Sequence, residues 1–350
     1  MSERIDLDRR RFFGAAAMAF AGTQLGILGC SKAQADTVRP GRLPPVKPGT
    51  NTSFGALKQI DAGVLNIGYG ESGPPDGPPV ILLHGWPYAI YSFVDVAALL
   101  AEAGYRVLVP NLRGHGTTRF LSSSTVRNAQ QSAVARDIIA FMDALDIPKA
   151  IIGGVDWGSR TTCIIAALWP ERCKAMVSVS GYLLTNVPAA NAPASPETEY
   201  QWWYASYFAT ERGPVGYEKN KREFGRFMWK LHSPKWNFDE AIFQRSIPTL
   251  DNEDNTAIVI HNYRWRYGLA PGEAQYDDLE RQLAVRPVIK VPAITLEGDA
   301  NGAPHPEPAS YRDRFTGKYE HRTVEGGIGH NLPLEAPQAF AQAVVDVDGF

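Results

Sequence analysis

The sequence predicts an α/β fold, with a mostly parallel, doubly wound sheet and a helical cap inserted between two of the later strands. Short apolar runs alternate with segments of helical spacing, which is typical of parallel strands joined by helices. The alternation stops between residues 182 and 276, where five of the eight tryptophans and eight of the fourteen tyrosines fall. A chain of 350 residues, 44% hydrophobic and 21% charged, can bury one large core with room for such an insertion.

The first half of the predicted core alternates between strand and helix. The run "PPVILLHG" at 78–85 is apolar and ends in Gly, as a buried parallel strand does. Residues 94–105 have helical character, and "RVLVP" at 106–110 is the next strand. The apolar residues of 132–147 recur at helical spacing, and a strand at 149–154 follows.

The second half of the core follows the same pattern around the insertion. Further strands are predicted at 174–180, 291–298 and 318–324. We therefore assign the core to residues 55–181 and 277–350 and the helical cap to residues 182–276, which we expect to roof the site.

The residues before the core form two further predicted segments. Residues 1–35 resemble a twin-arginine export signal, because Arg9, Arg10 and Arg11 precede an apolar run and an "AQA" cleavage site. We expect the export machinery of a bacterium as a partner and a periplasmic or secreted location. The alternatives are a membrane anchor through residues 12–30 and a loose match to a lipid-acylation site at Cys30. Residues 36–54 are rich in Pro and Gly and are predicted to be a tether.

The composition favours a small-molecule substrate. A formal net charge of −2, with no basic run after residue 11, argues against nucleic acid as a partner. No pair of histidines has metal-ligand spacing with carboxylates, and no Gly-rich phosphate loop follows a strand, so we expect no metal and no cofactor. Cys163 and Cys173 are predicted to be small buried apolar residues and not a disulfide.

The stretch "IIGGVDWGSR" at 151–160 carries the strongest chemical signal. A strand, then a nucleophile between small residues, then a helix forms a strained turn that exposes the central side chain. Here that residue is Asp156, and the chain has no G-x-S-x-G. A carboxylate is already ionised at neutral pH and can attack a saturated carbon, leaving an ester that water must hydrolyse with help from a base and an oxyanion hole.

The base and its supporting acid are predicted late in the chain. His330 stands in a Gly-rich loop, and Asp299 directly follows the strand at 291–298. Asp299 would hold the His330 tautomer and stabilise the imidazolium, with Glu297 as the rival acid. The oxyanion hole would come from the N–H groups of Trp86, in "HGWP", and Trp157, and a cis bond before Pro87 would make the first turn rigid.

These motifs resemble α/β-hydrolases of the epoxide hydrolase group, over roughly residues 55 to 350. "HGWP" is similar to the HGxP motif of that group, and "GVDWG" is similar to its G-x-D-x-G elbow, with Val155 where His is common. The resemblance implies the α/β-hydrolase fold and the opening of epoxides to diols, with an apolar or aromatic epoxide suggested by the aromatic cap. It also implies two cap tyrosines that donate to the epoxide oxygen: Tyr204 and Tyr263, with Tyr207 and Tyr267 as replacements that would otherwise bind substrate.

Two other functions stay open. Haloalkane and fluoroacetate dehalogenases share the Asp–His–Asp set, and Trp157 and Trp86 could hold a halide. Arg160 resembles the arginine with which fluoroacetate dehalogenases bind the substrate carboxylate, although a structural role under the cap is favoured. The third possibility is a catalytically silent binding protein, against which the joint presence of Asp156, His330 and Asp299 argues.

Overall fold

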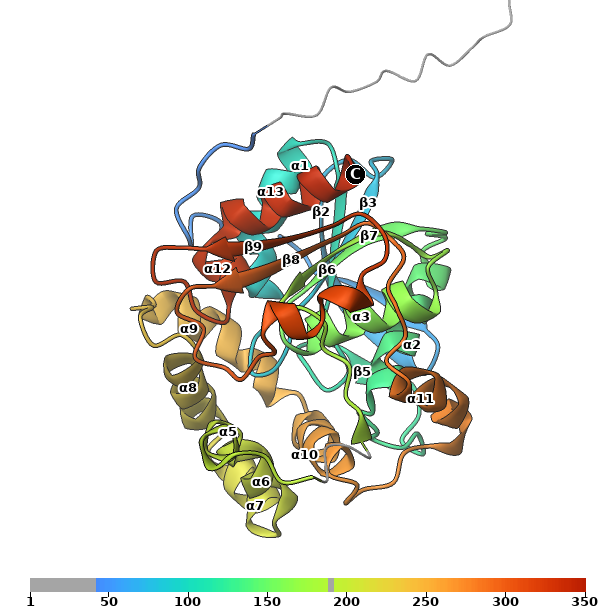
Figure 1. Ribbon diagram of the computed structural model, residues 1–350, viewed down its shortest axis with the longest axis vertical. Coiled ribbons are helices and arrows are strands. Elements are labelled where there is room, and N and C mark those ends of the chain that lie inside the picture. The colour runs from blue at the N-terminus through green and yellow to red at the C-terminus, as the bar shows by residue number, and fades with distance from the viewer. Residues whose placement is uncertain (1–41, 188–191) are drawn as a thin grey trace, which may run out of the picture. The chain divides into compact units, whose positions relative to one another are not determined.

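The computed structural model describes residues 42–187 and 192–350, and it confirms the predicted α/β-hydrolase architecture (Figure 1). In the described residues nine strands form one sheet. They are β1 (Lys58–Ala62), β2 (Leu65–Ser72), β3 (Pro79–Leu83), β4 (Arg106–Pro110), β5 (Arg119–Phe120), β6 (Ala150–Gly154), β7 (Cys173–Val179), β8 (Ala293–Gly298) and β9 (Tyr319–Val324).

The sheet has an antiparallel edge and a parallel body. Its order is β1-β2-β4-β3-β6-β7-β8-β9, with β5 paired to β2. The strands from β4 to β9 in that order pair in parallel, whereas β1, β2 and β5 pair antiparallel. The sequence patterns predicted each parallel strand but missed this antiparallel edge, whose hairpin turns at Gly63 with φ of +60°.

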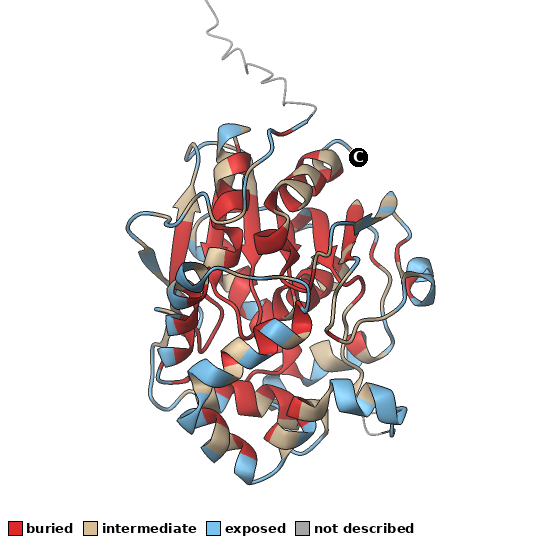
Figure 2. Cartoon of the chain, turned by 90° about the vertical axis from the view of Figure 1, so that its left-hand side faces the viewer, coloured by how far each residue is buried: buried red, intermediate tan, exposed pale blue. Residues whose placement is uncertain are grey.

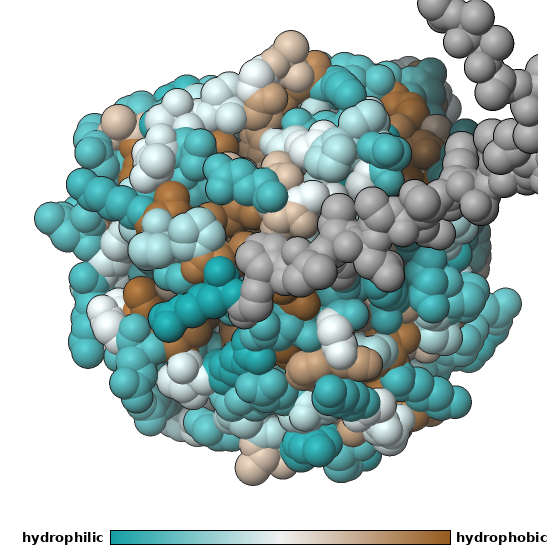
Figure 3. Space-filling model, turned by 90° about the horizontal axis from the view of Figure 1, so that it is seen from above, coloured by the Kyte–Doolittle hydropathy of each residue, from teal (hydrophilic) through white to brown (hydrophobic). Residues whose placement is uncertain are grey.

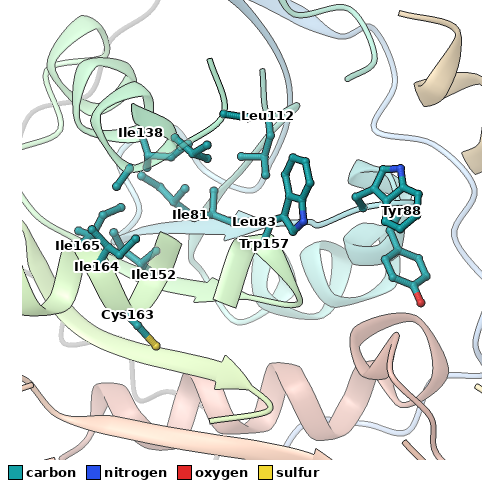
Figure 4. Close-up of a cluster of buried hydrophobic side chains, with 14 of the residues drawn as sticks. Ile81, Leu83, Tyr88, Leu112, Ile138, Ile152, Trp157, Cys163, Ile164 and Ile165 are labelled. Atoms are coloured by element: carbon teal, nitrogen blue, oxygen red, sulfur yellow. The ribbon is translucent and has the colours of Figure 1, made fainter. Parts of the chain in front are cut away.

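Helices cover both faces of the sheet. Helices α1 (Val94–Glu102), α12 (Leu332–Glu335) and α13 (Pro337–Asp348) pack on one face, and α2 (Gln131–Ala144) and α3 (Trp157–Leu168) on the other. The strands follow the period of two: Val80 and Leu82 join the cluster with α1 and α13, while Ile81 and Leu83 join the cluster with α2 and α3. Figure 4 shows the second cluster, with Ile81, Leu83 and Ile152 against Ile138, Ile164 and Ile165.

The described residues between β7 and β8 are mostly helical, with loops between the helices. They form α5 (Pro196–Gln201), α6 (Trp203–Ala209), α7 (Arg212–Lys219), α8 (Lys221–His232), α9 (Glu240–Ser246), α10 (Asn255–Arg266) and α11 (Asp277–Ala284). Ser195 caps α5 by accepting from the Thr198 N–H, and Asp239 caps α9 by accepting from that of Ala241. Helix α8 buries Gly225, Met228, Trp229 and His232, while Phe224 and Leu231 are partly buried against the core. Figure 2 shows buried residues concentrated in the centre of the molecule and exposed residues on the outer faces of the helices.

The tether prediction is wrong for the part of residues 36–54 that the structure describes. Leu43 is buried, its N–H donates to Gln342, and its carbonyl accepts from Gln338. The N–H groups of Gly49 and Asn51 both donate to the Asp95 carboxylate at 2.7 Å. Pro and Gly here keep the backbone out of helix and strand, but core side chains satisfy its polar groups.

The export signal, the membrane-anchor alternative and Cys30 lie outside the described residues. None of the helices within 42–187 and 192–350 is long and apolar enough to cross a bilayer. On the face drawn in Figure 3, hydrophobic residues appear as small separate areas between hydrophilic ones.

Candidate active site

Asp156 lies at a sharp turn between β6 and α3. Its backbone has φ of 57° and ψ of −119°, a conformation that costs about 1–3 kcal/mol for a residue other than Gly. A Cβ on Gly158 would lie 1.8 Å from the Leu83 carbonyl oxygen, and one on Gly154 would lie 2.3 Å from the Gly158 backbone. The small residues predicted at the elbow are therefore needed, because strand and helix nearly touch.

The two oxygens of the Asp156 carboxylate have different neighbours. Oδ1 accepts from the Trp86 N–H at 2.8 Å, and Oδ2 lies 3.5 Å from His330 Nε2. Burial disfavours ionisation, but His330, Arg160 and the Trp157 N–H outweigh it and lower the pKa below its ordinary value. The carboxylate is thus ionised at neutral pH, and its side chain remains 20% exposed.

The loop that carries Trp86 is held on both sides. The Trp86–Pro87 bond is cis, as predicted. A Cβ on Gly85 would lie 2.2 Å from Asp156 Oδ1, so only Gly lets the carboxylate reach the loop amides. On the cap side, Trp86 Nε1 donates to the Tyr217 hydroxyl at 2.8 Å, and that hydroxyl donates to Asn255 Oδ1 at 2.9 Å.

Replacing Tyr217 by Phe is expected to lower the free energy of unfolding by about 2–4 kcal/mol, because two buried polar groups lose their partner. Trp86 Nε1 and Asn255 Oδ1 would both be left without the hydroxyl. Urea unfolding measures the change. Tyr200→Phe is the control, since Tyr200 is 74% exposed and its loss should alter stability by less than about 0.5 kcal/mol. Equal stability of the two variants would contradict the proposed support of Trp86.

His330 faces Asp156 from the loop after β9. Its side chain is 5% exposed, and its ring lies between Tyr88, at 6.0 Å between ring centroids, and His232, at 5.2 Å. Its backbone N–H contacts the His232 carbonyl oxygen at 3.2 Å and the Ser233 hydroxyl oxygen at 3.1 Å. The structure therefore brings together the predicted nucleophile and the predicted base.

The structure does not bring Asp299 to His330, which corrects that part of the prediction. Asp299 is exposed, and its carboxylate accepts from the N–H groups of Gly326, Gly327 and Ile328 at 2.8–3.2 Å. Glu297, the rival, accepts from Asn301 at 2.7 Å. Within the described residues, neither carboxylate bonds to the His330 ring, whose Nδ1 has no hydrogen-bond partner. Asp299 follows the strand as expected, but three converging backbone donors hold its carboxylate.

Glu335 is the carboxylate that organises the histidine loop. It accepts from the N–H groups of Gly329 and Asn331, on either side of His330, and from the Ser233 hydroxyl. Burial raises its pKa, and these donors and His330 oppose that rise. Glu335 therefore positions His330 through the backbone of its loop, a role that no motif in the sequence indicated.

Tyr204 and Tyr263 lie together over the elbow. Their rings are 5.5 Å apart, and both contact Trp86, at 5.8 and 5.7 Å. Burial, together with the charge of Asp156, raises the pKa of both phenols above the ordinary value. Both hydroxyls thus stay protonated and can donate a hydrogen bond.

Tyr207 and Tyr267 do not line the cavity above Asp156, which corrects their assignment to substrate binding. Tyr207 lies one turn further along α6, where its ring stacks on Phe224 and contacts Trp203. Tyr267 directly follows the last residue of α10 and is not among the residues that line the cavity. Tyr204 lines the cavity. Tyr263 is outside that lining, but its ring lies 5.5 Å from that of Tyr204 and 6.2 Å from that of Trp157, and the charge of Asp156 contributes to its raised pKa.

A cavity of about 700 Å³ opens above the elbow. Asp156, Arg160, Tyr204 and His330 line it, so Arg160 faces the site, although the sequence had favoured a structural role for it. Nothing in the sequence indicated three further basic side chains in this lining: His232, Arg266 and Arg286. They come from α8, the end of α10 and the segment after α11, and no local motif marks them.

Three histidines around the site are fully buried and neutral. His84 accepts from the Leu112 N–H, and its Nδ1 lies 3.0 Å from the Gly85 carbonyl oxygen, so it supports the loop. Burial lowers the pKa of His84 to about 4 and those of His115 and His232 to about 3. Three other histidines, His261, His305 and His321, contact Pro271, Ala303 and Thr295.

These histidines predict a loss of stability on acidification. As the pH falls below 6.5 the unfolded chain protonates them, whereas the folded protein does so only near pH 4 and below, so stability is lost over this window. Between pH 7.5 and 5 the loss is about 2 kcal/mol per histidine. Urea unfolding at the two pH values measures it, and His115→Gln should reduce the loss by about one third. An unchanged urea midpoint between the two pH values would show that the buried histidines do not destabilise the protein on acidification.

Within residues 42–187 and 192–350, no three His, Cys, Asp or Glu side chains are grouped as metal ligands. Cys163 and Cys173 are buried free thiols, as predicted.

Comparison with known proteins agrees with this geometry. Residues 78–217 match the family model described as alpha/beta hydrolase fold. A crystal structure from Klebsiella pneumoniae, assigned provisionally as an epoxide hydrolase, is 57% identical, with a TM-score of 0.84 over 85% of this chain and 98% of that one. The structure of potato epoxide hydrolase I, at 19% identity and a TM-score of 0.67, shares the fold.

Two curated relatives match over shorter stretches. Epoxide hydrolase B of Mycobacterium tuberculosis is 32% identical over 157 residues, 41% of this chain and 43% of that protein. A haloalkane dehalogenase of Mycolicibacterium paratuberculosis is 32% identical over 142 residues, 41% of this chain and 45% of that protein. The match thus spans less than half the length of these relatives. From the Klebsiella match, which covers nearly that whole chain, and from the elbow, this protein is an epoxide hydrolase-like enzyme of the α/β-hydrolase fold family.

Proposed function

We propose that the protein opens epoxides to vicinal diols through an ester on Asp156. The observation that supports the proposal is that the two oxygens of this carboxylate have different neighbours. Oδ1 accepts a hydrogen bond from the Trp86 N–H, and Oδ2 faces His330. Oδ2 attacks a ring carbon, the C–O bond of the epoxide breaks, and the oxygen takes a proton from Tyr204 or Tyr263. The product of this step is a hydroxyalkyl ester of Asp156.

The second step hydrolyses that ester. His330 takes a proton from water, and the hydroxide adds to Cγ of Asp156. Negative charge then develops on Oδ1, where the N–H groups of Trp86 and Trp157 are already directed. The bond between Cγ and the ester oxygen breaks, and His330 gives its proton to that oxygen, so that the diol leaves. The proton left on the regenerated Asp156 carboxyl passes through solvent to the phenolate. Residues 182–276 act as the cap that excludes bulk water.

Oxygen-18 water tests this sequence of steps. In a single turnover of styrene oxide, the label should appear in the carboxylate of the Asp156 peptide, and the diol should carry unlabelled oxygen from the enzyme. Label found directly in the diol, with none on Asp156, would mean that water attacks the epoxide without an ester.

The dehalogenase alternative has less support. A halide would need two free N–H donors. Trp157 Nε1 has no hydrogen-bond partner among the described residues and could serve as one, but Trp86 Nε1, the second, already donates to Tyr217 within the buried network. Two phenols facing Asp156 suit an alkoxide, which needs a proton, better than a halide, which does not. The assembled nucleophile, base and donors likewise disfavour a silent binding protein.

We also propose that the protein is exported through the twin-arginine pathway, on the strength of Arg9, Arg10 and Arg11 before the apolar segment. In a bacterial host, replacing Arg10 and Arg11 by Lys should leave the full-length chain in the cytoplasmic fraction. Unchanged appearance in the periplasm would contradict this.

A further inference from the structure

The charges that line the cavity above Asp156 are unbalanced. Arg160, Arg266 and Arg286 come from three separate segments and all line it. Among the described lining residues Asp156 is the one carboxylate. The cavity therefore carries a net positive charge even with the nucleophile ionised.

Arg160 is buried without a strong partner. It is 9% exposed, and its one hydrogen bond to a described side chain is a long one, 3.4 Å from Nη1 to Asn262 Oδ1. It lies one helical turn after Asp156, and its N–H donates to the Asp156 carbonyl oxygen. Burial and the charge of Arg266 lower the pKa of Arg160 to about 10, so it remains a cation at neutral pH.

Arg113 shows how this protein treats a buried arginine with a structural role. Its side chain is 2% exposed, and Nε and Nη2 donate to the two oxygens of Asp137 at 2.6 and 2.7 Å. Such pairing offsets the desolvation of a buried charge. Arg160 has no ion pair of this kind within the described residues, so its guanidinium is available to a ligand.

Arg266 is held in place by aromatic rings. Its guanidinium lies 4.5 Å from the centroid of Trp202 and 5.8 Å from that of Tyr263. It forms no ion pair with a carboxylate in the described part of the chain, and it is only half-buried. Arg286 is exposed at the mouth of the same cavity. The three arginines of the cavity lining thus range from exposed Arg286 through half-buried Arg266 to buried Arg160.

We propose that the substrate is an epoxide that carries a carboxylate, and that Arg160 and Arg266 bind this carboxylate while Asp156 attacks the ring. This inference rests on the proposed function and narrows its substrate class. Guanidinium groups suit carboxylates because they donate parallel hydrogen bonds as well as charge. They also offset the repulsion that an anionic substrate would meet from Asp156. The aromatic wall around them leaves room for an apolar body on the substrate.

The first experiment measures binding without chemistry. Calorimetric titration of the full-length protein compares 3-phenylpropanoate with 3-phenylpropanamide, which have the same shape and differ in charge. We expect the carboxylate to bind at least about tenfold tighter. This ratio should fall towards one in Arg160→Met and in Arg266→Met, and it should persist in Arg222→Met. Arg222 is the control because it is an exposed cap arginine outside the cavity lining.

The outcomes separate this inference from the proposed function. Equal affinity for the two compounds in the wild type, or a preference that survives in both cavity variants, would overturn the anion site. If circular dichroism shows that Arg160→Met is unfolded, the Arg266→Met variant alone decides the test, because Arg266 is only half-buried. The second experiment compares hydrolysis of 3-phenylglycidate and its amide. Diol from both at equal rates overturns the inference alone, whereas a binding preference with no diol from either overturns the proposed function alone.

Discussion

A His330→Gln variant is expected to react once with styrene oxide and then stop, with kcat lower by about 10³-fold or more. Asp156 needs no base to attack, since the ordinary pKa of an aspartate is about 3.9, and Arg160 and the Trp157 N–H still oppose the effect of burial after His330 is removed. Hydrolysis of the ester does need a base, and the imidazole is the group that lies 3.5 Å from Oδ2. The ester should therefore accumulate.

Intact-mass spectrometry should find about one adduct per protein molecule, and digestion should place it on the Asp156 peptide. His321→Gln is the matched control, because His321 lies on β9 outside the cavity lining and should leave turnover near that of the wild type. A bromoalkane incubated in parallel distinguishes the rival reaction. An adduct from the bromoalkane alone would favour a dehalogenase, and a rate loss with no adduct from either compound would contradict the covalent mechanism.

The elbow could be predicted because its residue pattern is local. Asp156 sits between Gly154, whose Cβ would meet the Gly158 backbone, and Gly158, whose Cβ would meet Leu83 on the neighbouring strand β3. The parallel strands were likewise visible as continuous apolar runs, since both of their faces are buried. The antiparallel edge was missed because β1 is partly exposed, with a burial pattern that mixes polar and apolar residues.

The prediction placed Asp299 correctly after β8 but wrongly directed its carboxylate to His330. A sequence shows that Asp299 follows a strand, whereas the direction of its carboxylate depends on the turn at 326–328, which packs beside it. The role of Glu335 was not predicted at all. Glu335 acts on His330 through backbone groups, and a glutamate in a helix carries no signature of such a role.

The walls of the cavity could not be predicted because they come from long-range packing of the cap. His232 meets His330 only because α8 ends against the histidine loop, where the His232 carbonyl accepts from the His330 N–H. Arg266 reaches the site because Trp202 and Tyr263 hold its guanidinium. The expected apolar substrate followed from counting aromatic residues, and two of those rings, Trp202 and Tyr263, lie against the guanidinium of Arg266.

The double variant Tyr204→Phe/Tyr263→Phe is expected to lose about 10³- to 10⁴-fold in kcat/KM for styrene oxide, and each single variant about 10- to 100-fold. Opening the ring produces an alkoxide, which is a poor leaving group unless a donor meets it. The two rings lie 5.5 Å apart in the field of Asp156, so either phenol can serve when the other is absent. Removing both leaves the oxygen without a phenolic donor.

The step affected must be ring opening and not hydrolysis of the ester. In the His330→Gln background, the rate of adduct formation with styrene oxide should fall by the same factor as kcat/KM. Tyr207→Phe is the control, since its ring packs against Phe224 away from the cavity. A bromoalkane adds a second comparison, because a departing bromide needs no proton and its attack should be insensitive to both tyrosines. If the double variant instead opens epoxides at the rate of the control, the phenols pack the cap and protonation comes from solvent.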